Sequence, residues 1–174
     1  MTNGTGVNVQ DENDGKSYAG RAVVEVSDGF RIGAFMGIHD YDNVLGRTQY
    51  GTACGVDLDW GGWSTVHVQA ALVGGDNWKE LDATGGTARF MTGQAVVTYY
   101  IPVDSERWAA IEPLVRVSWG DPDTDTADDA AWLVTPGLSM FVSGRNKIGA
   151  NLDLYLPQEG DSDVSLKLQA FLYL

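Results

Sequence analysis

The sequence predicts an all-β fold whose strands run up and down in antiparallel order. Apolar and polar side chains alternate with a period of two along almost the whole chain of 174 residues, and hardly any segment repeats at the helical period. The alternating segments are roughly 10 to 13 residues long, about twice the usual length of a strand in a soluble sheet. Short and long connections alternate between them.

Four alternating segments occupy the first half of the chain, over residues 18–26, 31–39, 50–60 and 65–72. In the first, Tyr18, Val24 and Val26 share one side, and Arg21 and Glu25 share the other. Successive side chains of a strand point to opposite faces of the sheet. Each segment is therefore expected to present one apolar and one more polar face.

Five further segments follow, over residues 94–101, 111–119, 137–143, 147–156 and 165–174. Their apolar positions are rich in valine, isoleucine and leucine. The opposite positions include Glu112, Arg116, Lys147, Asp153 and Lys167. The chain is thus expected to form about nine strands.

The connections between these segments differ in length and charge. Tight ones are expected at residues 28–29, 61–62 and 144–146, with a slightly longer one at 103–107, and long acidic ones at 40–47, 74–86, 120–130 and 158–163. Outer-membrane barrels have short turns at one end and long loops at the other, and about 9 to 11 tilted residues per strand cross a bilayer. The sequence therefore predicts an antiparallel up-and-down transmembrane β-barrel of about nine or ten strands.

The odd number of clear strands affects the domain assignment. Closed bacterial barrels normally have an even number of strands, so one more is expected before residue 17. We assign residues 1–16 to a partial first strand and its loop, and residues 1–174 to one barrel domain or to the C-terminal part of one. A small structural barrel of about ten strands with no transport role is the other interpretation.

Composition excludes several classes of function. The 24 acidic residues outnumber 11 Lys+Arg, and the net charge of -13 argues against a nucleic-acid partner, which requires a basic surface. The single cysteine, Cys54, excludes an internal disulfide and is expected to be a buried, inert thiol. No nucleophile elbow, phosphate loop or metal-binding spacing is present, so we expect no enzyme, catalytic residue, metal or cofactor.

Three local features need separate interpretations. The segment 121–126 has alternating aspartates, but Thr126 and Trp132 stand where a calcium-binding EF-hand loop needs glycine and glutamate, so a solvated acidic loop is expected. Trp119 and Trp132 flank that loop and are expected at a membrane interface. Proline removes a donor from a strand ladder, so Pro113 is expected to mark a bulge and Pro136 a broken strand start, or either to lie on a strand that faces a subunit interface.

The second half of the chain resembles a known family. The run Ile-Glu-Pro-Leu-Val-Arg-Val-Ser at 111–118, Pro-Gly-Leu at 136–138, Arg-Asn-Lys-Ile at 145–148 and Leu-Lys-Leu-Gln-Ala-Phe at 166–171 resemble the C-terminal half of porins of the phosphate-selective type. The resemblance covers about residues 17–174. It implies a trimeric outer-membrane channel of about sixteen strands, of which this chain would hold the last nine or ten.

These observations together predict a porin-like barrel in the bacterial outer membrane, through which small hydrophilic solutes or anions diffuse passively. Its expected partners are outer-membrane lipid, the permeating solute and, in a full-length protein, two further copies. Charges of both signs lie on the polar side, so anion selectivity stays open. The alternative is a soluble β-sandwich that binds carbohydrate or another ligand through its acidic loops. The pore-lining candidates are Arg21, Glu25, Arg31, Glu112, Arg116, Lys147, Asp153 and Lys167.

Overall fold

The computed structural model describes residues 16–42, 48–61, 65–81, 87–143 and 146–173, and these form ten strands in one sheet. None of the described segments is a helix long and apolar enough to cross a membrane. The strands are β1 (Tyr18–Ser27), β2 (Phe30–Asp42), β3 (Thr48–Trp60), β4 (Val66–Leu81), β5 (Thr87–Tyr99), β6 (Ile101–Pro102), β7 (Ala110–Asp121), β8 (Ala131–Ser143), β9 (Asn146–Pro157) and β10 (Asp163–Phe171).

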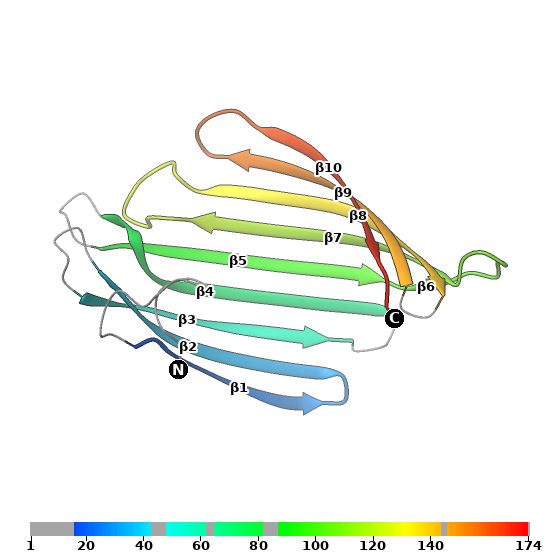
Figure 1. The fold of residues 1–174 in the computed structure, drawn as a ribbon, viewed down its shortest axis with the longest axis horizontal. Coiled ribbons are helices and arrows are strands. Elements are labelled where there is room, and N and C mark those ends of the chain that lie inside the picture. The colour runs from blue at the N-terminus through cyan, green and yellow to red at the C-terminus, as the bar shows by residue number, and fades with distance from the viewer. Residues whose placement is uncertain (1–15, 43–47, 62–64, 82–86, 144–145, 174) are drawn as a thin grey trace.

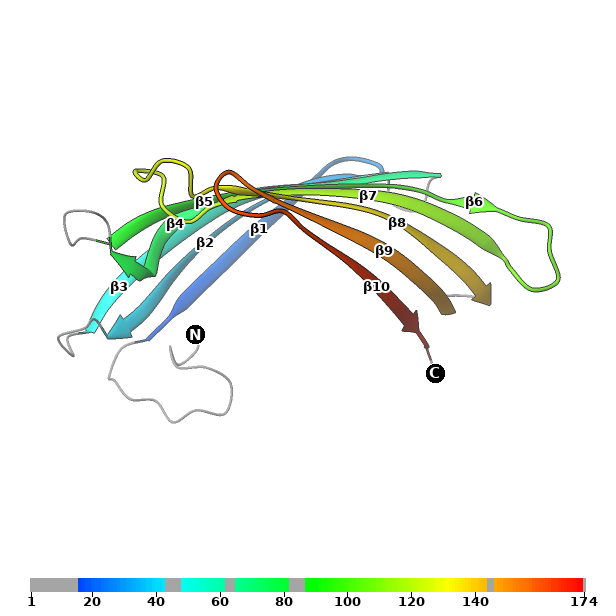
Figure 2. The same ribbon diagram turned by 90° about the horizontal axis from the view of Figure 1, so that it is seen from above.

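The sheet is a single antiparallel meander, which confirms the predicted all-β, up-and-down fold (Figure 1). Strands β1 to β5 and β7 to β10 pair in chain order, and β6 continues β5 along the edge of β7. The sheet is arched, and its two outermost strands, β1 and β10, run in the same direction (Figure 2). Within the described residues they pair only with β2 and β9, so the sheet is not closed into a barrel.

The strand register aligns the apolar positions of all nine paired strands. One line of direct neighbours crosses the whole sheet and contains only apolar side chains, which we call the apolar row: Val24, Ile32, Leu58, Ala70, Ala95, Val117, Val134, Leu154 and Val164. A slip of one residue in any pair would turn that strand's side chains to the other face. The alternation in the sequence is therefore realised as two chemically distinct faces.

The two ends of the sheet differ less in loop length than the sequence predicts, because the connection of residues 103–109 at the end with the short turns is longer than that of residues 158–162 at the opposite end. The β1–β2 turn is short, whereas the β7–β8 and β9–β10 loops lie at the opposite end (Figure 1). The loop predicted at 74–86 begins too early, because β4 extends to Leu81, and the strand expected from residue 94 already begins at Thr87, directly after the predicted end of that loop. The carboxylate of Asp76 accepts hydrogen bonds from the backbone nitrogen and hydroxyl of Thr52 at 2.7 and 2.8 Å, which joins the extension of β4 to β3.

Both prolines lie inside regular strands, so the predictions of a bulge at Pro113 and a strand start at Pro136 are wrong. Pro113 pairs in register with Leu138, and Pro136 pairs with Val115. Each proline interrupts the pairing of its strand with the neighbour on the opposite edge. The pairing of β7 with β5 and β6 has a gap between Leu114 and Ile111, and the pairing of β8 with β9 has a gap between Val134 and Gly137. A missing N–H donor explains a gap on one side without a change of register.

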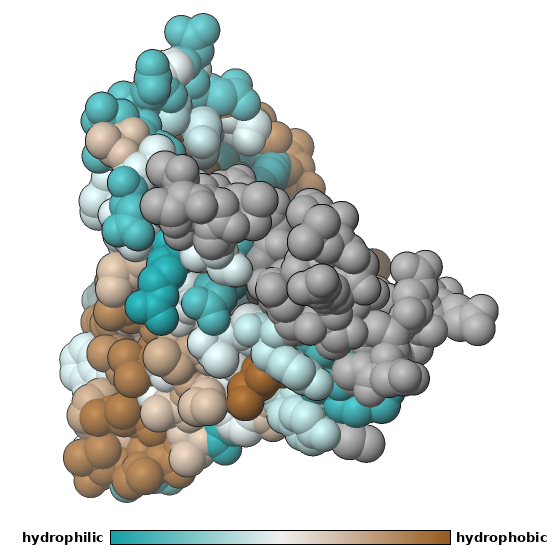
Figure 3. Space-filling view, turned by 90° about the vertical axis from the view of Figure 1, so that its left-hand side faces the viewer, coloured by the Kyte–Doolittle hydropathy of each residue, from teal (hydrophilic) through white to brown (hydrophobic). Residues whose placement is uncertain are grey.

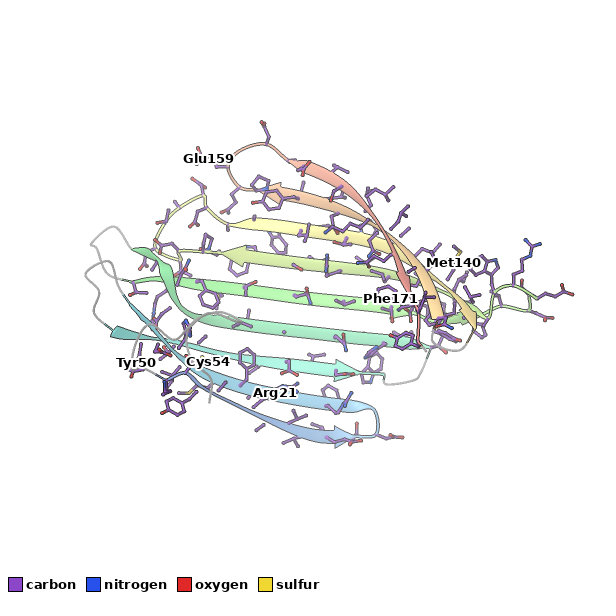
Figure 4. The ribbon with its side chains drawn as sticks, in the orientation of Figure 1. Arg21, Tyr50, Cys54, Met140, Glu159 and Phe171 are labelled. Atoms are coloured by element: carbon purple, nitrogen blue, oxygen red, sulfur yellow. The ribbon has the colours of Figure 1, made fainter. Side chains whose placement is uncertain are left out.

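The structure places three other side chains that were singled out from the sequence. Trp119 and Trp132 are direct neighbours on β7 and β8 at the end that carries the acidic loop, with ring centroids 6.4 Å apart. Cys54, by contrast, is exposed on β3 near Tyr50 and is not a buried thiol (Figure 4). The sequence correctly predicts that Cys54 lies on the apolar side of its strand. That side is exposed because no second layer of described residues covers it. The partial first strand and loop assigned to residues 1–16 lie outside the described residues, except for residue 16.

Candidate pore-facing wall

A line of mainly polar side chains lies one residue along the strands from the apolar row, on the opposite face. This polar row consists of Glu25, Arg31, Asp59, Gln69, Val96, Arg116, Thr135, Asp153 and Ser165. Only Val96 among them is apolar. The face that bears the polar row, called the polar face below, is the candidate functional surface.

Near β1 the polar face carries an ion pair that spans two strand spacings. Arg21 on β1 donates to both carboxylate oxygens of Asp57 on β3, at 2.5 Å from Nη2 and 3.2 Å from Nε. Gly33 on β2 is the register neighbour of Asp57, and a Cβ there would come within 2.5 Å of Asp57 Oδ2. The absence of a side chain at Gly33 therefore lets the two charged groups meet over β2.

A second cluster surrounds Asp59. Its carboxylate accepts a hydrogen bond from Arg31 Nη2 at 2.9 Å and a longer one from the Gln69 side-chain amide at 3.4 Å. His67 Nε2 lies 2.9 Å from the other oxygen. Three strands thus contribute to one hydrogen-bonded group, and both oxygens of Asp59 have partners.

A third cluster centres on Asp153, near the other edge of the sheet. Thr135 donates its hydroxyl hydrogen to Asp153 Oδ1 at 2.6 Å, and Arg116 Nη2 lies 3.4 Å from the same oxygen. Lys167 Nζ on β10 donates to Oδ2. Asp153 and Thr135 are almost completely buried, with 4% and 1% of their surface exposed. A buried carboxylate needs such partners, because burial of an unpaired charge is very costly.

The fourth cluster lies at the end of the sheet with the short turns. Lys147 Nζ is 3.5 Å from a carboxylate oxygen of Glu112. The same ammonium group lies 5.2 Å from the centroid of the Phe141 ring and 5.6 Å from that of Phe171. The charge of Lys147 is therefore held by a carboxylate and by two aromatic faces, one of them on the edge strand β10.

The structure places all eight predicted pore-lining residues on the polar face. Seven are in ion pairs: Arg21, Arg31, Glu112, Arg116, Lys147, Asp153 and Lys167. Glu25 is the register neighbour of Arg31, but it takes part in none of the ion pairs found among the described residues. The eight do not form one site. They are distributed over separate clusters along the wall.

Sequence reasoning missed several members of these clusters as candidates. Thr135 was missed because the strand was expected to begin at Gly137, whereas β8 begins at Ala131 and runs through three consecutive apolar residues, Trp132 to Val134, that do not alternate. The pairing of Asp57 with Arg21 depends on registers across two strand pairs, which the sequence does not display. Asp57 lies two residues along β3 from Gly55, which is the residue in register with Arg21, so a search of direct strand neighbours would not have found the pair either.

The two faces differ in how far their side chains are covered. Large side chains on the apolar face are well exposed, for example Val24 at 63% and Val56 at 53%, whereas Ser139, like Thr135 and Asp153, is buried on the polar face. Side chains converge on the inner side of an arch, so we assign the polar face to the concave side. In Figure 3, hydrophobic surface gathers at the lower left, and a smaller hydrophobic group lies at the upper right.

The acidic β7–β8 loop is organised by the side chain of Asp123. The carboxylate of Asp123 accepts hydrogen bonds from the backbone nitrogen of Asp125 at 3.2 Å and from the hydroxyl of Thr126 at 2.8 Å. No group of three or more histidine, cysteine or acidic side chains in the described parts of the chain is arranged to hold a metal ion. The carboxylate of Asp123 thus has a structural role in forming the turn.

Comparison with known proteins adds no identification. No family model matches the chain, and no curated protein or solved structure matches it.

Proposed function

We propose that this chain forms part of the wall of a porin-like outer-membrane β-barrel, through which small hydrophilic solutes diffuse passively. The observation that carries this proposal is the contrast between the two faces of one sheet. The apolar row extends over nine strands without an interruption, and the polar row beside it carries the ion-pair clusters.

The exposed apolar face supports a lipid environment for that side of the sheet. Soluble monomers rarely expose contiguous apolar patches of more than a few hundred Å². The strands of this sheet are mostly 12 to 16 residues long, which is enough to cross a bilayer when tilted. Among the described residues there is one sheet, and a β-sandwich would need a second sheet to cover the apolar face.

The polar face supports contact with water and solute. In transmembrane barrels with a channel, the residues that face the lumen are polar and alternate with those that face lipid. Here Ala71 on β4 points to the polar face beside Asp57, and its chain neighbour Leu72 points to the apolar face beside Val56. The proposal therefore assigns opposite environments to adjacent residues.

Cysteine labelling of this neighbouring pair tests the proposal. Ala71→Cys and Leu72→Cys would each be made with Cys54→Ala, and the protein reconstituted in phospholipid vesicles. We expect Ala71→Cys to react with a charged, water-soluble maleimide and Leu72→Cys to react only with a lipid-soluble one. Equal reaction of both with the charged reagent would contradict a lipid-facing surface, and no reaction of Ala71→Cys would contradict a water-filled lumen. Swelling of the same vesicles in sucrose measures passage directly.

A further inference from the structure

A hollow of about 540 Å³ lies on the polar face over strands β1 to β5. Its polar lining consists of two arginine–aspartate pairs and two glutamines: Arg21, Asp57, Arg31, Asp59, Gln69 and Gln94. Binding pockets for small molecules are commonly about 300 to 1,000 Å³ in volume. The hollow is therefore large enough for a small solute.

The charges that line this hollow are already matched within the wall. Arg21 occupies both oxygens of Asp57, and Arg31 is paired with Asp59. The remaining oxygen of Asp59 is 2.9 Å from His67 Nε2. An anion entering the hollow would meet two carboxylates beside the guanidinium groups, and a cation would meet carboxylates that already have partners. Neither sign of charge is favoured by the formal charges of the lining.

Hydrogen-bonding groups remain available after these pairs are formed. Gln94 uses its oxygen to accept a hydrogen bond from Ser118 at 3.2 Å, and Gln69 uses its amide nitrogen toward Asp59. No hydrogen bond found among the described residues uses the Gln94 amide nitrogen or the Gln69 side-chain oxygen. The hollow thus offers a donor and an acceptor on neighbouring strands, with the partly exposed guanidinium of Arg31 beside them.

We infer that this hollow is a weak binding site for a neutral, polyhydroxylated solute, such as a small saccharide. A hydroxyl group both donates and accepts, so it matches side-by-side amide donors and acceptors, and a neutral solute needs no unpaired charge on the wall. The lining contains no aromatic side chain to stack on a sugar ring, which suits rapid exchange. The inference rests on the proposed function and specifies the solute class that the wall contacts.

Binding can be measured without any passage of solute. Saturation-transfer NMR on the full chain in detergent micelles would use sucrose as the probe, with inorganic phosphate as competitor. We expect transfer to sucrose that phosphate does not displace. Gln94→Leu is expected to weaken the affinity for sucrose about fivefold, the value of one ordinary hydrogen bond. Gln94→Glu keeps the shape of the side chain but removes the amide donor, and it should weaken binding similarly.

The matched control is Gln169→Leu, which removes the same group from the polar face of β10, outside the hollow. This variant should bind sucrose as the unaltered protein does. Absence of transfer to sucrose, displacement of sucrose by phosphate, or equal losses in Gln94→Leu and Gln169→Leu would overturn the inference. Vesicle swelling without sucrose binding would overturn the inference and leave the proposed function standing. Sucrose binding without the labelling contrast between Ala71→Cys and Leu72→Cys would leave the binding site standing and contradict the proposed function.

Discussion

Thr135 donates its hydroxyl hydrogen to Oδ1 of Asp153 at 2.6 Å, beside the interruption of the β8–β9 ladder at Pro136. A side-chain hydrogen bond thus connects the two strands where the backbone of Pro136 has no donor. The same carboxylate is held from the other side by Lys167 of β10. Three strands are joined through one buried acid, and several stability predictions follow from such links.

Replacement of Thr135 by valine keeps the shape of the side chain and removes the donor to Asp153. Loss of a hydrogen bond to a buried charged group is expected to lower the free energy of unfolding by about 1 to 3 kcal/mol. The measurement is the denaturant midpoint of the protein folded in micelles. Thr98→Val is the matched control, because the Thr98 side chain makes no hydrogen bond found in the described part of the chain. Equal losses in both variants would contradict the assigned role of Thr135.

Gly33→Ala should disturb the Arg21–Asp57 pair, because the new Cβ would lie within 2.5 Å of the carboxylate. We expect a loss of about 1 to 3 kcal/mol in the free energy of unfolding, the range for overpacking a well-filled position. Gly20→Ala on β1 is the control, because nothing lies within 4 Å of its added Cβ. That variant should be neutral or slightly stabilising. If both variants unfold at the same denaturant concentration, the Arg21–Asp57 pair does not depend on the absence of a side chain at Gly33.

Lys147→Met would remove the ion pair with Glu112 and the contacts of the ammonium group with two phenylalanine rings. These contributions are each expected to be below or near 1 kcal/mol, so the combined loss should be about 1 to 2 kcal/mol. Because Phe171 lies on β10, amide hydrogen exchange should become faster in that strand first. Lys147→Arg retains the charge and should retain most of the protection. Unchanged exchange in β10 after Lys147→Met would show that the cluster does not hold the edge strand.

Pro113→Val would restore the backbone donor that β7 lacks opposite the β5–β6 gap. The new N–H is expected to bond across to the neighbouring strand, so that pairing becomes continuous from Leu114 to Ile111. The measurement is amide exchange of residue 113 by NMR, compared with that of Val115 in the same variant. Slow exchange at both positions is the expected result. Exchange at residue 113 as fast as in an exposed loop would mean that the gap has another cause.

The alternation of side chains was sufficient to predict the strands, their antiparallel order and the face on which Arg116 and Asp153 lie. It could not predict where a strand ends in a stretch such as 74–81, because the extension of β4 depends on contacts of Asp76 with Thr52 of another strand. The ion pairs could not be predicted from the alternation either. Which acid meets Arg21 is decided by two strand registers and by the missing side chain of Gly33.

The shared direction of β1 and β10 restricts how this arch can become a ring. Neighbours around an antiparallel ring must alternate in direction, so the total number of strands is even. The arch contributes nine, and any antiparallel completion must therefore add an odd number of strands between β10 and β1. A second identical arch with the same orientation in the membrane also begins and ends with strands of that direction. The two arches would therefore meet at two places, and at each place the neighbouring strands would be parallel. A single arch that closed by pairing β1 with β10 would contain one such parallel pair.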